Sequence, residues 1–121
     1  MKPANSKKEC PVKYTINILS GKWKLKTLWE LQGNECIRFN ELRRRIEGIS
    51  NVALKRALLE LEEDGIIKRV QYDEVPPKVE YSLTEKGRSL NSAFLEMIKW
   101  ANTYDSNTYS LEEILEVKKF L

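Results

Sequence analysis

Residues 40–65 read NELRRRIEGISNVALKRALLELEEDG and contain two helical patterns that are separated by one turn. Asn40 is of a residue type that caps helix N-termini, and it predicts a short helix over 41–46. Ser50 is placed in the same way before a second helix, which we expect over 51–63. Only about four residues, including a glycine, join the two helices, and this layout is that of a helix-turn-helix.

The helix over 51–63 has an apolar side and a polar side. With about 100° of rotation per residue, the side that faces the core is expected to hold Leu54, Ala57, Leu58 and Leu61. The opposite side carries groups long enough to reach base edges and phosphates in a major groove, and a valine that can contact a thymine methyl. The candidate DNA-binding residues of this helix are Ser50, Asn51, Val52, Lys55 and Arg56. An ordinary solvated surface helix is the alternative interpretation.

The hydrophobic period changes after this helix. Residues 66–72 and 78–83 have the composition of strands, and the two prolines between them predict a hairpin with a stiff tip. A hairpin that follows a helix-turn-helix makes the wing of a winged helix-turn-helix. The candidate phosphate contacts on the wing are Lys68, Arg69 and Lys78. Asp73 and Glu74 at its tip argue against deep insertion into DNA.

Further phosphate contacts are expected ahead of the wing. Lys22 stands at the expected start of a helix over 22–32, where a helix N-terminus favours phosphate. Arg38 and Asn40, at the start of the next helix, are candidate contacts to the DNA backbone.

The charge of the chain is unevenly distributed. Residues 1–56 hold thirteen Lys and Arg against five Asp and Glu, a net charge of +8, whereas residues 57–121 carry a net charge of −5. A basic first half indicates a polyanionic partner. Within it, Arg43 begins a run of three arginines that fans over about 200°, so only part of the run can touch phosphate. The rest is solvated or paired with Glu41 or Glu47.

Helical patterns also flank the winged unit. We expect a helix over 11–19, a long helix over 85–104 capped by Thr84, and a last helix capped by Ser110. Their apolar side chains exceed what a small winged domain can bury, which favours a symmetric dimer. The candidate dimer-interface residues are Val12, Ile16, Leu90, Phe94, Met97, Ile98, Ala101, Leu111, Ile114 and Leu115. The alternative is that these side chains pack into their own domain, and for part of them this must hold.

Together these elements predict a mainly α fold with a small β-hairpin wing, an α+β winged helix-turn-helix with extra N- and C-terminal dimerisation helices. We expect an N-terminal arm over 1–10, the winged domain over 11–104 and a C-terminal dimerisation helix over 105–121. A length of 121 residues favours a single domain, so we expect these three segments to share one hydrophobic core.

The composition excludes several classes of function. The sequence has no histidine, which removes Ser-His-Asp and Cys-His catalysis and histidine metal sites. Its five glycines form no phosphate-binding loop, and its two cysteines make neither a disulfide scaffold nor a zinc site. We therefore expect no enzyme activity, no cofactor and no metal. No apolar run approaches the roughly 18 residues of a membrane span and no signal peptide is visible, so we expect a cytoplasmic protein without a membrane partner.

Six motifs along the chain carry a family resemblance. They are Cys10-Pro11-Val12, Gly21-Lys22-Trp23, Arg38-Phe39-Asn40-Glu41-Leu42, Gly48-Ile49-Ser50, Leu58-Leu59-Glu60-Leu61-Glu62-Glu63-Asp64-Gly65 and Val75-Pro76-Pro77-Lys78-Val79-Glu80-Tyr81-Ser82-Leu83-Thr84-Glu85-Lys86-Gly87. These motifs resemble the HxlR-type transcriptional regulators, and the similarity covers residues 10–101 of this chain.

The resemblance implies a homodimeric DNA-binding protein of prokaryotes that represses or activates nearby genes. It implies that the helix over 51–63 reads the major groove of double-stranded DNA and that the wing approaches the backbone or the minor groove. The first helix and the C-terminal helices then build the dimer. Two-fold symmetry predicts a palindromic operator with half-sites about 10 bp apart, or a multiple of that. The sequence identifies no small-molecule effector.

Cys10 is a candidate sensor thiol. It directly precedes the first helix with Lys7 and Lys8 upstream, and both features favour a reactive thiolate, whereas Glu9 acts in the opposite direction. The resemblance implies that a cysteine at this Cys-Pro position senses oxidants, quinones or aldehydes in several family members. The alternative is an unreactive thiol at the dimer edge. Cys36 is expected to serve packing.

Two classes of function are therefore compared. One is a sequence-specific transcriptional regulator, and the other is a winged-helix protein-interaction module without specific DNA binding, because a fold does not determine a function. The basic first half and the cations Lys55 and Arg56 favour DNA. Val52 and Leu59 are the only exposed apolar residues on that helix that favour protein docking.

Overall fold

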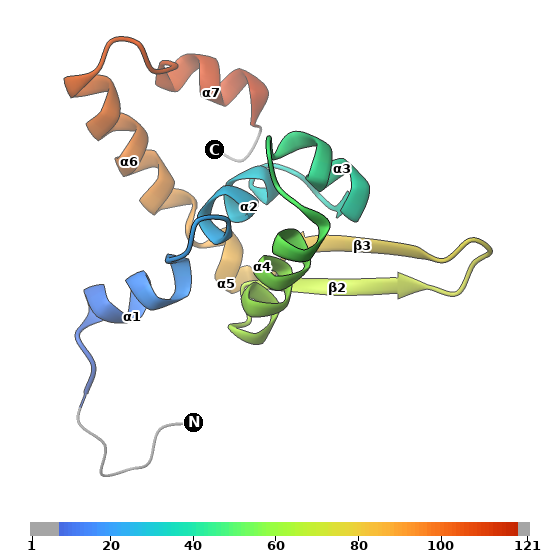
Figure 1. The fold of residues 1–121 in the computed structure, drawn as a ribbon. Coiled ribbons are helices and arrows are strands. Elements are labelled where there is room, and N and C mark those ends of the chain that lie inside the picture. The colour runs from blue at the N-terminus through green and yellow to red at the C-terminus, as the bar shows by residue number, and fades with distance from the viewer. Residues whose placement is uncertain (1–7, 119–121) are drawn as a thin grey trace.

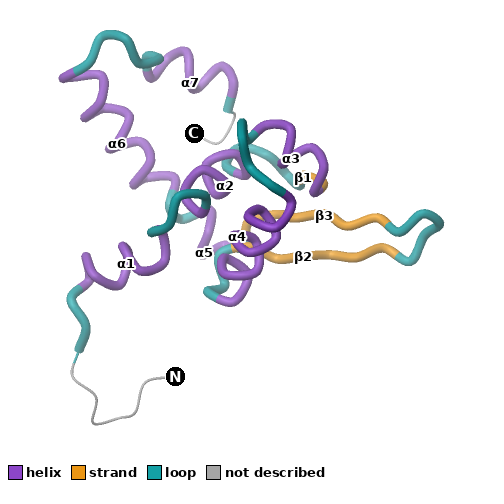
Figure 2. Tube along the Cα trace, in the orientation of Figure 1, coloured by secondary structure: helices purple, strands orange, loops and turns teal. Residues whose placement is uncertain are grey.

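The computed structural model describes residues 8–118. Its elements are, in chain order, α1 (Pro11–Leu19), α2 (Lys24–Leu31), β1 (Ile37–Arg38), α3 (Phe39–Arg45), α4 (Asn51–Glu63), β2 (Ile67–Tyr72), β3 (Lys78–Leu83), α5 (Glu85–Arg88), α6 (Asn91–Tyr104) and α7 (Leu111–Val117). The β2–β3 hairpin projects from one side of a helical body, and α1 and α6 extend from the other side (Figures 1 and 2). The predicted fold class is confirmed, and of the expected N-terminal arm only residues 8–10 are described.

The wing belongs to a three-stranded antiparallel sheet with the strand order β1-β3-β2. β2 and β3 pair along their whole length, beginning with Ile67 opposite Leu83. The short strand β1 pairs with the other edge of β3, where Arg38 lies opposite Glu80. Because β1 leads directly into α3, this edge strand connects the base of the wing to the helix-turn-helix.

The core lies between α2, α4 and the base of the sheet. The side of α4 that the helical period predicted to face inward is buried, and it holds Leu54, Ala57, Leu58 and Leu61. From α2, Leu28 and Leu31 are buried beside them. The ring centroids of Trp29 on α2 and Phe94 on α6 lie 5.1 Å apart. The N-terminal end of α6 is therefore packed against α2.

The turn between α3 and α4 follows local conformational rules. Gly48 has a φ of +82°, a left-handed conformation that glycine adopts at little cost. Oγ of Ser50 accepts a hydrogen bond from the backbone N–H of Ala53 at 3.0 Å, so the predicted cap is confirmed. The predicted cap at Asn40 is wrong, because α3 begins at Phe39. Since β1 ends at Arg38, the chain enters the helix one residue before Asn40, which lies in the first turn.

The long helix expected over 85–104 is divided into α5 and α6. The predicted cap Thr84 is confirmed, since its Oγ1 accepts from the N–H of Gly87 at 3.1 Å. The helix then stops because the carbonyl of Gly87 bonds elsewhere: it accepts from Nε2 of Gln32 at 3.2 Å and from the N–H of Leu90 at 3.2 Å. That carbonyl would otherwise accept from the backbone of Asn91 in a continuous α-helix.

The C-terminal helix α7 returns to the body through Lys118. Ser110 and Glu113 form a reciprocal capping box at its start, in agreement with the predicted cap. Nζ of the buried Lys118 donates to the carbonyls of Trp29 at 2.8 Å and Gln32 at 3.2 Å, at the C-terminal end of α2. Burial lowers the pKa of Lys118. This cation satisfies helix-end carbonyls, an arrangement that also suits the negative end of the helix dipole.

Gly87 lies where α5 crosses the backbone at the end of α4. A Cβ added there would come within 2.2 Å of the carbonyl oxygen of Ile66 and 3.1 Å of a methyl group of Leu83. The first of these atoms belongs to the backbone, which cannot move away without displacing the start of β2.

We predict that Gly87→Ala lowers the free energy of unfolding by about 1–3 kcal/mol, because overpacking forces the backbone apart. Urea titration followed by circular dichroism measures this. Ser92→Ala, on the exposed face of α6, is the control and should change stability by less than about 0.5 kcal/mol. Equal stability of the two variants would contradict the tight contact.

Candidate nucleic-acid interface

The outward side of α4 is exposed in the part that carries the predicted DNA-binding residues. Val52 is 70% exposed and Leu59, two turns further along, is 55% exposed. Asn51, Lys55 and Arg56 are exposed on the same half of the helix. The predicted outward stripe is therefore present, and the first turn of α4 is its most accessible part.

Arg56 lies on the flank of α4 that faces the turn before α2. A groove of about 330 Å³ separates the two segments, and Arg56 and Lys22 both line it. Lys22 does not stand at a helix N-terminus, as the sequence predicted, because α2 begins at Lys24 and residues 21–23 form a turn. The structure nevertheless brings this lysine beside α4, because two segments that lie some thirty residues apart in the sequence approach each other.

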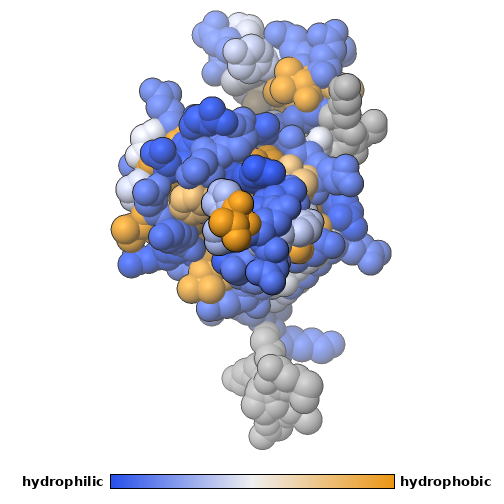
Figure 3. Space-filling model, turned by 90° about the vertical axis from the view of Figure 1, so that its right-hand side faces the viewer, coloured by the Kyte–Doolittle hydropathy of each residue, from blue (hydrophilic) through white to orange (hydrophobic). Residues whose placement is uncertain are grey.

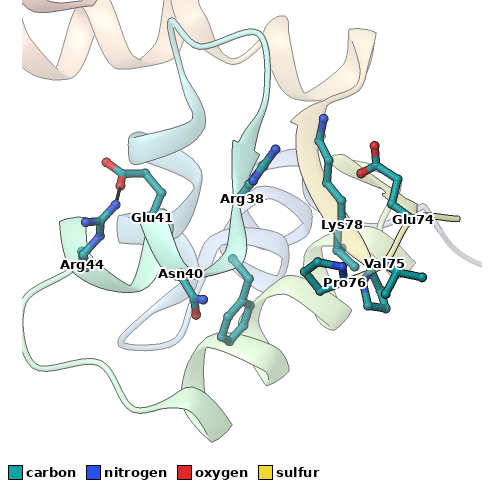
Figure 4. Close-up of a pocket in the computed structure, with 11 residues that line it drawn as sticks. Arg38, Asn40, Glu41, Arg44, Glu74, Val75, Pro76 and Lys78 are labelled. Carbon is teal, nitrogen blue, oxygen red and sulfur yellow. Dashed lines mark hydrogen bonds and ion pairs between the residues drawn. The ribbon is translucent and has the colours of Figure 1, made fainter. Parts of the chain in front are cut away.

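A larger hollow of about 950 Å³ lies between the start of α3 and the tip of the wing. Figure 4 shows Arg38 and Lys78 on opposite sides of it, with their charged ends extending in the same direction, whereas Asn40 points another way. Glu74 also lines the hollow from the wing. The predicted backbone contacts of α3 and of the wing thus share one concave surface, while Asn40 is not aligned with the two cations.

The three consecutive arginines of α3 divide as the sequence analysis expected. Arg44 pairs with Glu41, and Nε of Arg45 lies 3.1 Å from Oε1 of the same glutamate. These cations lower the pKa of Glu41, chiefly through the hydrogen bond from Arg45. Within residues 8–118, Arg43 makes no hydrogen bond or ion pair, so it is the arginine of this run that is available to a phosphate.

Glu80 contacts the side chains of Lys78 and Cys36 on the solvent-facing side of the sheet. Its carboxylate lies 3.7 Å from Nζ of Lys78 and accepts a hydrogen bond from the thiol of Cys36 at 3.3 Å. The bond from Cys36 is the main reason why the pKa of Glu80 is lowered, and the same bond raises the pKa of Cys36. Nζ of Lys78 also lies 4.7 Å from the ring centroid of Tyr72. Cys36 is therefore an exposed, hydrogen-bonded thiol and not the packing residue expected from the sequence.

The wing cations and the face around them are exposed. Lys68 and Arg69 lie on β2, where Arg69 donates to Oε1 of Gln71 at 3.1 Å. The side of the molecule toward which the wing points is mainly hydrophilic, with scattered apolar side chains (Figure 3). Val75, at the wing tip, is fully exposed.

The candidate dimer residues fall into two groups. Val12 and Ile16 are exposed on α1, at 64% and 55%, and Met97 is exposed on α6. Phe94, by contrast, is 6% exposed and packs in the core of its own chain, which is where the alternative interpretation placed part of this set. The half-buried residues of the set are Leu90, Ile98, Ala101, Leu111, Ile114 and Leu115.

An apolar groove of about 450 Å³ runs between α2 and α6. Its lining includes Leu25, Trp29, Met97, Ile98 and Ala101. Sequence reasoning missed a pair of aromatic residues on α6: Trp100 and Tyr104 are exposed, with ring centroids 5.3 Å apart. Their spacing of four residues was the available signal, since it places both on one face of a helix.

Cys10 is exposed and occupies the cap position of α1, where its side chain makes no capping bond. Within residues 8–118, no three His, Cys, Asp or Glu side chains are grouped so that they would hold a metal ion. None of the described helices has the length and apolar character needed to cross a membrane.

Comparison with known proteins is consistent with this geometry. The HTH-type transcriptional regulator YdeP of Bacillus subtilis is 46% identical over 103 residues, which are 85% of this chain and 80% of YdeP. The structure of the oxidised redox regulator HypR superposes with a TM-score of 0.70 at 45% identity, over 78% of this chain and 96% of HypR. The reduced transcriptional regulator YodB of B. subtilis gives a TM-score of 0.71 at 33% identity, over 84% of this chain and all of YodB.

The pattern of the HxlR-like helix-turn-helix family matches residues 18–109, which include the helix-turn-helix, the wing, α6 and the loop that leads to α7. With most of its length matched and with relatives that are HTH-type transcriptional regulators, the chain is a transcriptional regulator of the HxlR-like helix-turn-helix family.

Proposed function

We propose that the protein binds a palindromic operator as a homodimer and regulates transcription in a sequence-specific manner. The observation that carries this proposal is the exposed first half of α4, which presents Asn51, Val52 and Lys55. Arg56 and Lys22 line a groove on one flank of this helix, and Arg38 and Lys78 line a hollow between α3 and the wing. An amide, a methyl-bearing and a cationic side chain are suited to base edges in a major groove. The flanking cations are suited to the phosphates on either side of that groove.

The phosphate contacts are assigned from position. On one flank we assign Lys22 together with Arg56, which line one groove, and on the wing side Arg38 and Lys78, which line the larger hollow. Arg43 of α3 is assigned because it is the arginine of its run without an ion pair within residues 8–118. The sequence analysis named Arg56 as a candidate for contacts with base edges or phosphates, and its location beside Lys22 favours the phosphates. Ser50 is occupied with its own helix cap, so its hydroxyl supports the recognition helix and is not assigned to a base.

The dimer is assigned to the side opposite the wing. A second copy is the occupant that suits the apolar groove between α2 and α6, because α1 exposes the apolar side chains of Val12 and Ile16 one turn apart. Burying both surfaces between copies would leave the wing and α4 free for DNA, since they lie on the other side (Figure 1). Isologous pairing of this kind produces the two-fold symmetry of a palindromic site.

The first test is a titration of the purified protein against the intergenic DNA upstream of its own gene, at two salt concentrations and with random DNA as competitor. A shift that survives competition supports specific regulation. Absence of binding at low salt would refute the DNA proposal and favour a protein-interaction module, for which the exposed Val52 and Leu59 would be the docking residues.

Substitutions separate base contacts from phosphate contacts. We expect Asn51→Ala to weaken operator binding by about 1–3 kcal/mol and to relax specificity, with little change in the salt dependence. Lys22→Ala and Arg56→Ala should instead weaken binding to all sequences and lower the salt slope by about one each. Fluorescence anisotropy on operator and scrambled DNA measures both quantities. Lys99→Ala, on α6, is the control, and equal behaviour of Asn51→Ala and Lys22→Ala would show the assignment to be wrong.

Dimerisation is tested by placing a charge on α1. Ile16→Glu should shift the protein from dimer to monomer in sedimentation velocity, because a carboxylate is costly to bury in an apolar groove. Lys68→Glu makes the same kind of charge change at an exposed position of the wing strand β2, away from α1 and α6, and serves as the control. A fully dimeric Ile16→Glu protein would rule out α1 as the dimer contact.

Cys10 is proposed as the thiol through which operator binding responds to oxidants. It is exposed at the start of the helix assigned to the dimer, and one similar structure is that of a redox regulator. Cys36 is a weaker candidate, because its raised pKa leaves less thiolate at neutral pH.

We expect Cys10→Ser to abolish the effect of diamide on operator binding and Cys36→Ser to retain it. In the presence of a small thiol, diamide removes two electrons and two protons from the pair of thiols as the disulfide forms. Gel shift with and without diamide, followed by dithiothreitol, measures the response and its reversal. An unchanged response in Cys10→Ser would exclude Cys10 as the sensor.

A further inference from the structure

Two lysines connect α1 to the recognition helix, and neither is used in the DNA or dimer contacts assigned above. Lys24, at the start of α2, is only 8% exposed. Its Nζ donates to the carbonyl of Asn17 in the last turn of α1 at 3.3 Å and lies 3.6 Å from Oε2 of Glu60 on α4. Because a buried ammonium needs partners, Lys24 holds these two helices at a defined separation.

Lys86 makes the second connection. From α5, its Nζ donates to the hydroxyl of Tyr14 on α1 at 3.0 Å and to the carbonyl of Asp64, at the C-terminal end of α4, at 2.9 Å. The ammonium also lies 5.6 Å from the ring centroid of Tyr14. This lysine therefore bridges the same pair of helices as Lys24 from a different element.

Each of the two lysines contacts one point on α1 and one point near the C-terminal end of α4. On α1, Tyr14 and Asn17 are three residues apart and lie on one face of the helix. On α4, Glu60 and Asp64 are four residues apart at the end of the helix, again on one side. One attachment point would leave α1 free to swing about it, whereas two points separated along both helices restrain the angle between them.

The remaining packing of α1 does not set this angle. Of its residues only Ile18 is buried and Leu19 half-buried, and both lie at its C-terminal end. The residues before them, from Pro11 to Asn17, are exposed. Apolar packing thus anchors one end of α1, and the polar bridges determine the direction in which the rest of the helix points.

We propose that Lys24 and Lys86 form a two-point strut that fixes the orientation of α1 relative to the recognition helix α4. They are positioning residues, since they touch no base or phosphate in the assignment above. In a dimer built through α1, the strut sets how far apart and at what angle the two recognition helices are held. A change at α1, whether pairing with a second copy or chemistry at Cys10, then reaches α4 through these bridges; this consequence rests on the proposed function.

The strut itself is tested without DNA. With Cys10 and Cys36 replaced by serine, spin labels at Lys13→Cys on α1 and Lys55→Cys on α4 report the distance between these helices, and dilution with unlabelled protein isolates the distance within one chain. The parent should show one narrow distance distribution by pulsed EPR. Lys24→Met and Lys86→Met keep the aliphatic part of the side chain, lose both polar bonds, and should each broaden the distribution.

Two further variants distinguish the loss of the bridge from a general loss of structure. Lys86→Arg retains a cationic donor and should restore the narrow distribution, while Lys99→Met, which removes an exposed lysine paired with Glu96, should leave it unchanged. Lys86 is exposed, so its methionine variant should fold even if Lys24→Met does not. A distribution in folded Lys86→Met that is as narrow as that of the parent would overturn the proposal.

The consequence for DNA binding has its own readout. One base pair inserted between the operator half-sites should reduce the affinity of the parent by about tenfold, and that of Lys86→Met by less than about threefold, because a hinged dimer adapts to the spacing. Binding to an isolated half-site should be the same for both proteins. If Lys86→Met broadens the distances but no DNA is bound specifically by the parent, the strut stands and the proposed function fails. If the parent binds specifically and both proteins show the same spacing penalty, the strut does not control the recognition helices.

Discussion

The close approach of α5 to the backbone at the end of α4 is the contact on which the rest of the structure depends. The carbonyl of Ile66 accepts from the N–H of Thr84 at 3.0 Å, and Gly87 lies so near that no side chain fits between them. The recognition helix, both strands of the wing and α6 all begin or end within a few residues of this junction. Their relative directions therefore depend on one small volume, in which a glycine is required by lack of space.

The charges of the protein are divided according to this geometry. Acidic partners neutralise some of the cations on the side assigned to DNA, as Glu41 does for Arg44 and Arg45. Lys22 and Arg56 line the same groove, while Arg43 remains unpaired within residues 8–118. In the proposed complex, the cations without an ion pair would attract phosphate, whereas Glu41 neutralises Arg44 and Arg45. Fewer free cations lower non-specific affinity, which in that complex leaves more of the discrimination to the base contacts.

Sequence reasoning succeeded where structure is set by near neighbours. The buried side of α4, its cap at Ser50 and the bounds of the second wing strand follow from helical period, capping chemistry and turn residues a few positions away. It failed where a segment distant in the sequence determines where a helix begins or ends. The division of the expected 85–104 helix depends on Gln32, which lies 55 residues before the carbonyl it binds, and the start of α3 depends on the pairing of β1 with β3.

The same distinction explains which parts of the candidate site were visible. The helical period alone predicts which side of a helix is exposed, so the exposure of Lys55 and Arg56 on α4 could be predicted from the sequence. The role of Lys86 was hidden because its partners Tyr14 and Asp64 lie 72 and 22 residues away.

Lys24 and Lys86 are informative because their polar contacts contribute little to stability, those of Lys24 because it is buried and those of Lys86 because it is exposed. Burying a cation against a carbonyl and a partly exposed carboxylate gains little net free energy, since desolvation offsets most of the attraction. What such a pair adds is direction, because hydrogen bonds constrain geometry more narrowly than apolar contact does. The fold thus places directional contacts between the helix assigned to the dimer and the helix assigned to DNA, as it also does where Gln32 and Lys118 donate to backbone carbonyls. A regulator that must hold two recognition helices in register benefits from directional contacts at that connection more than at any other.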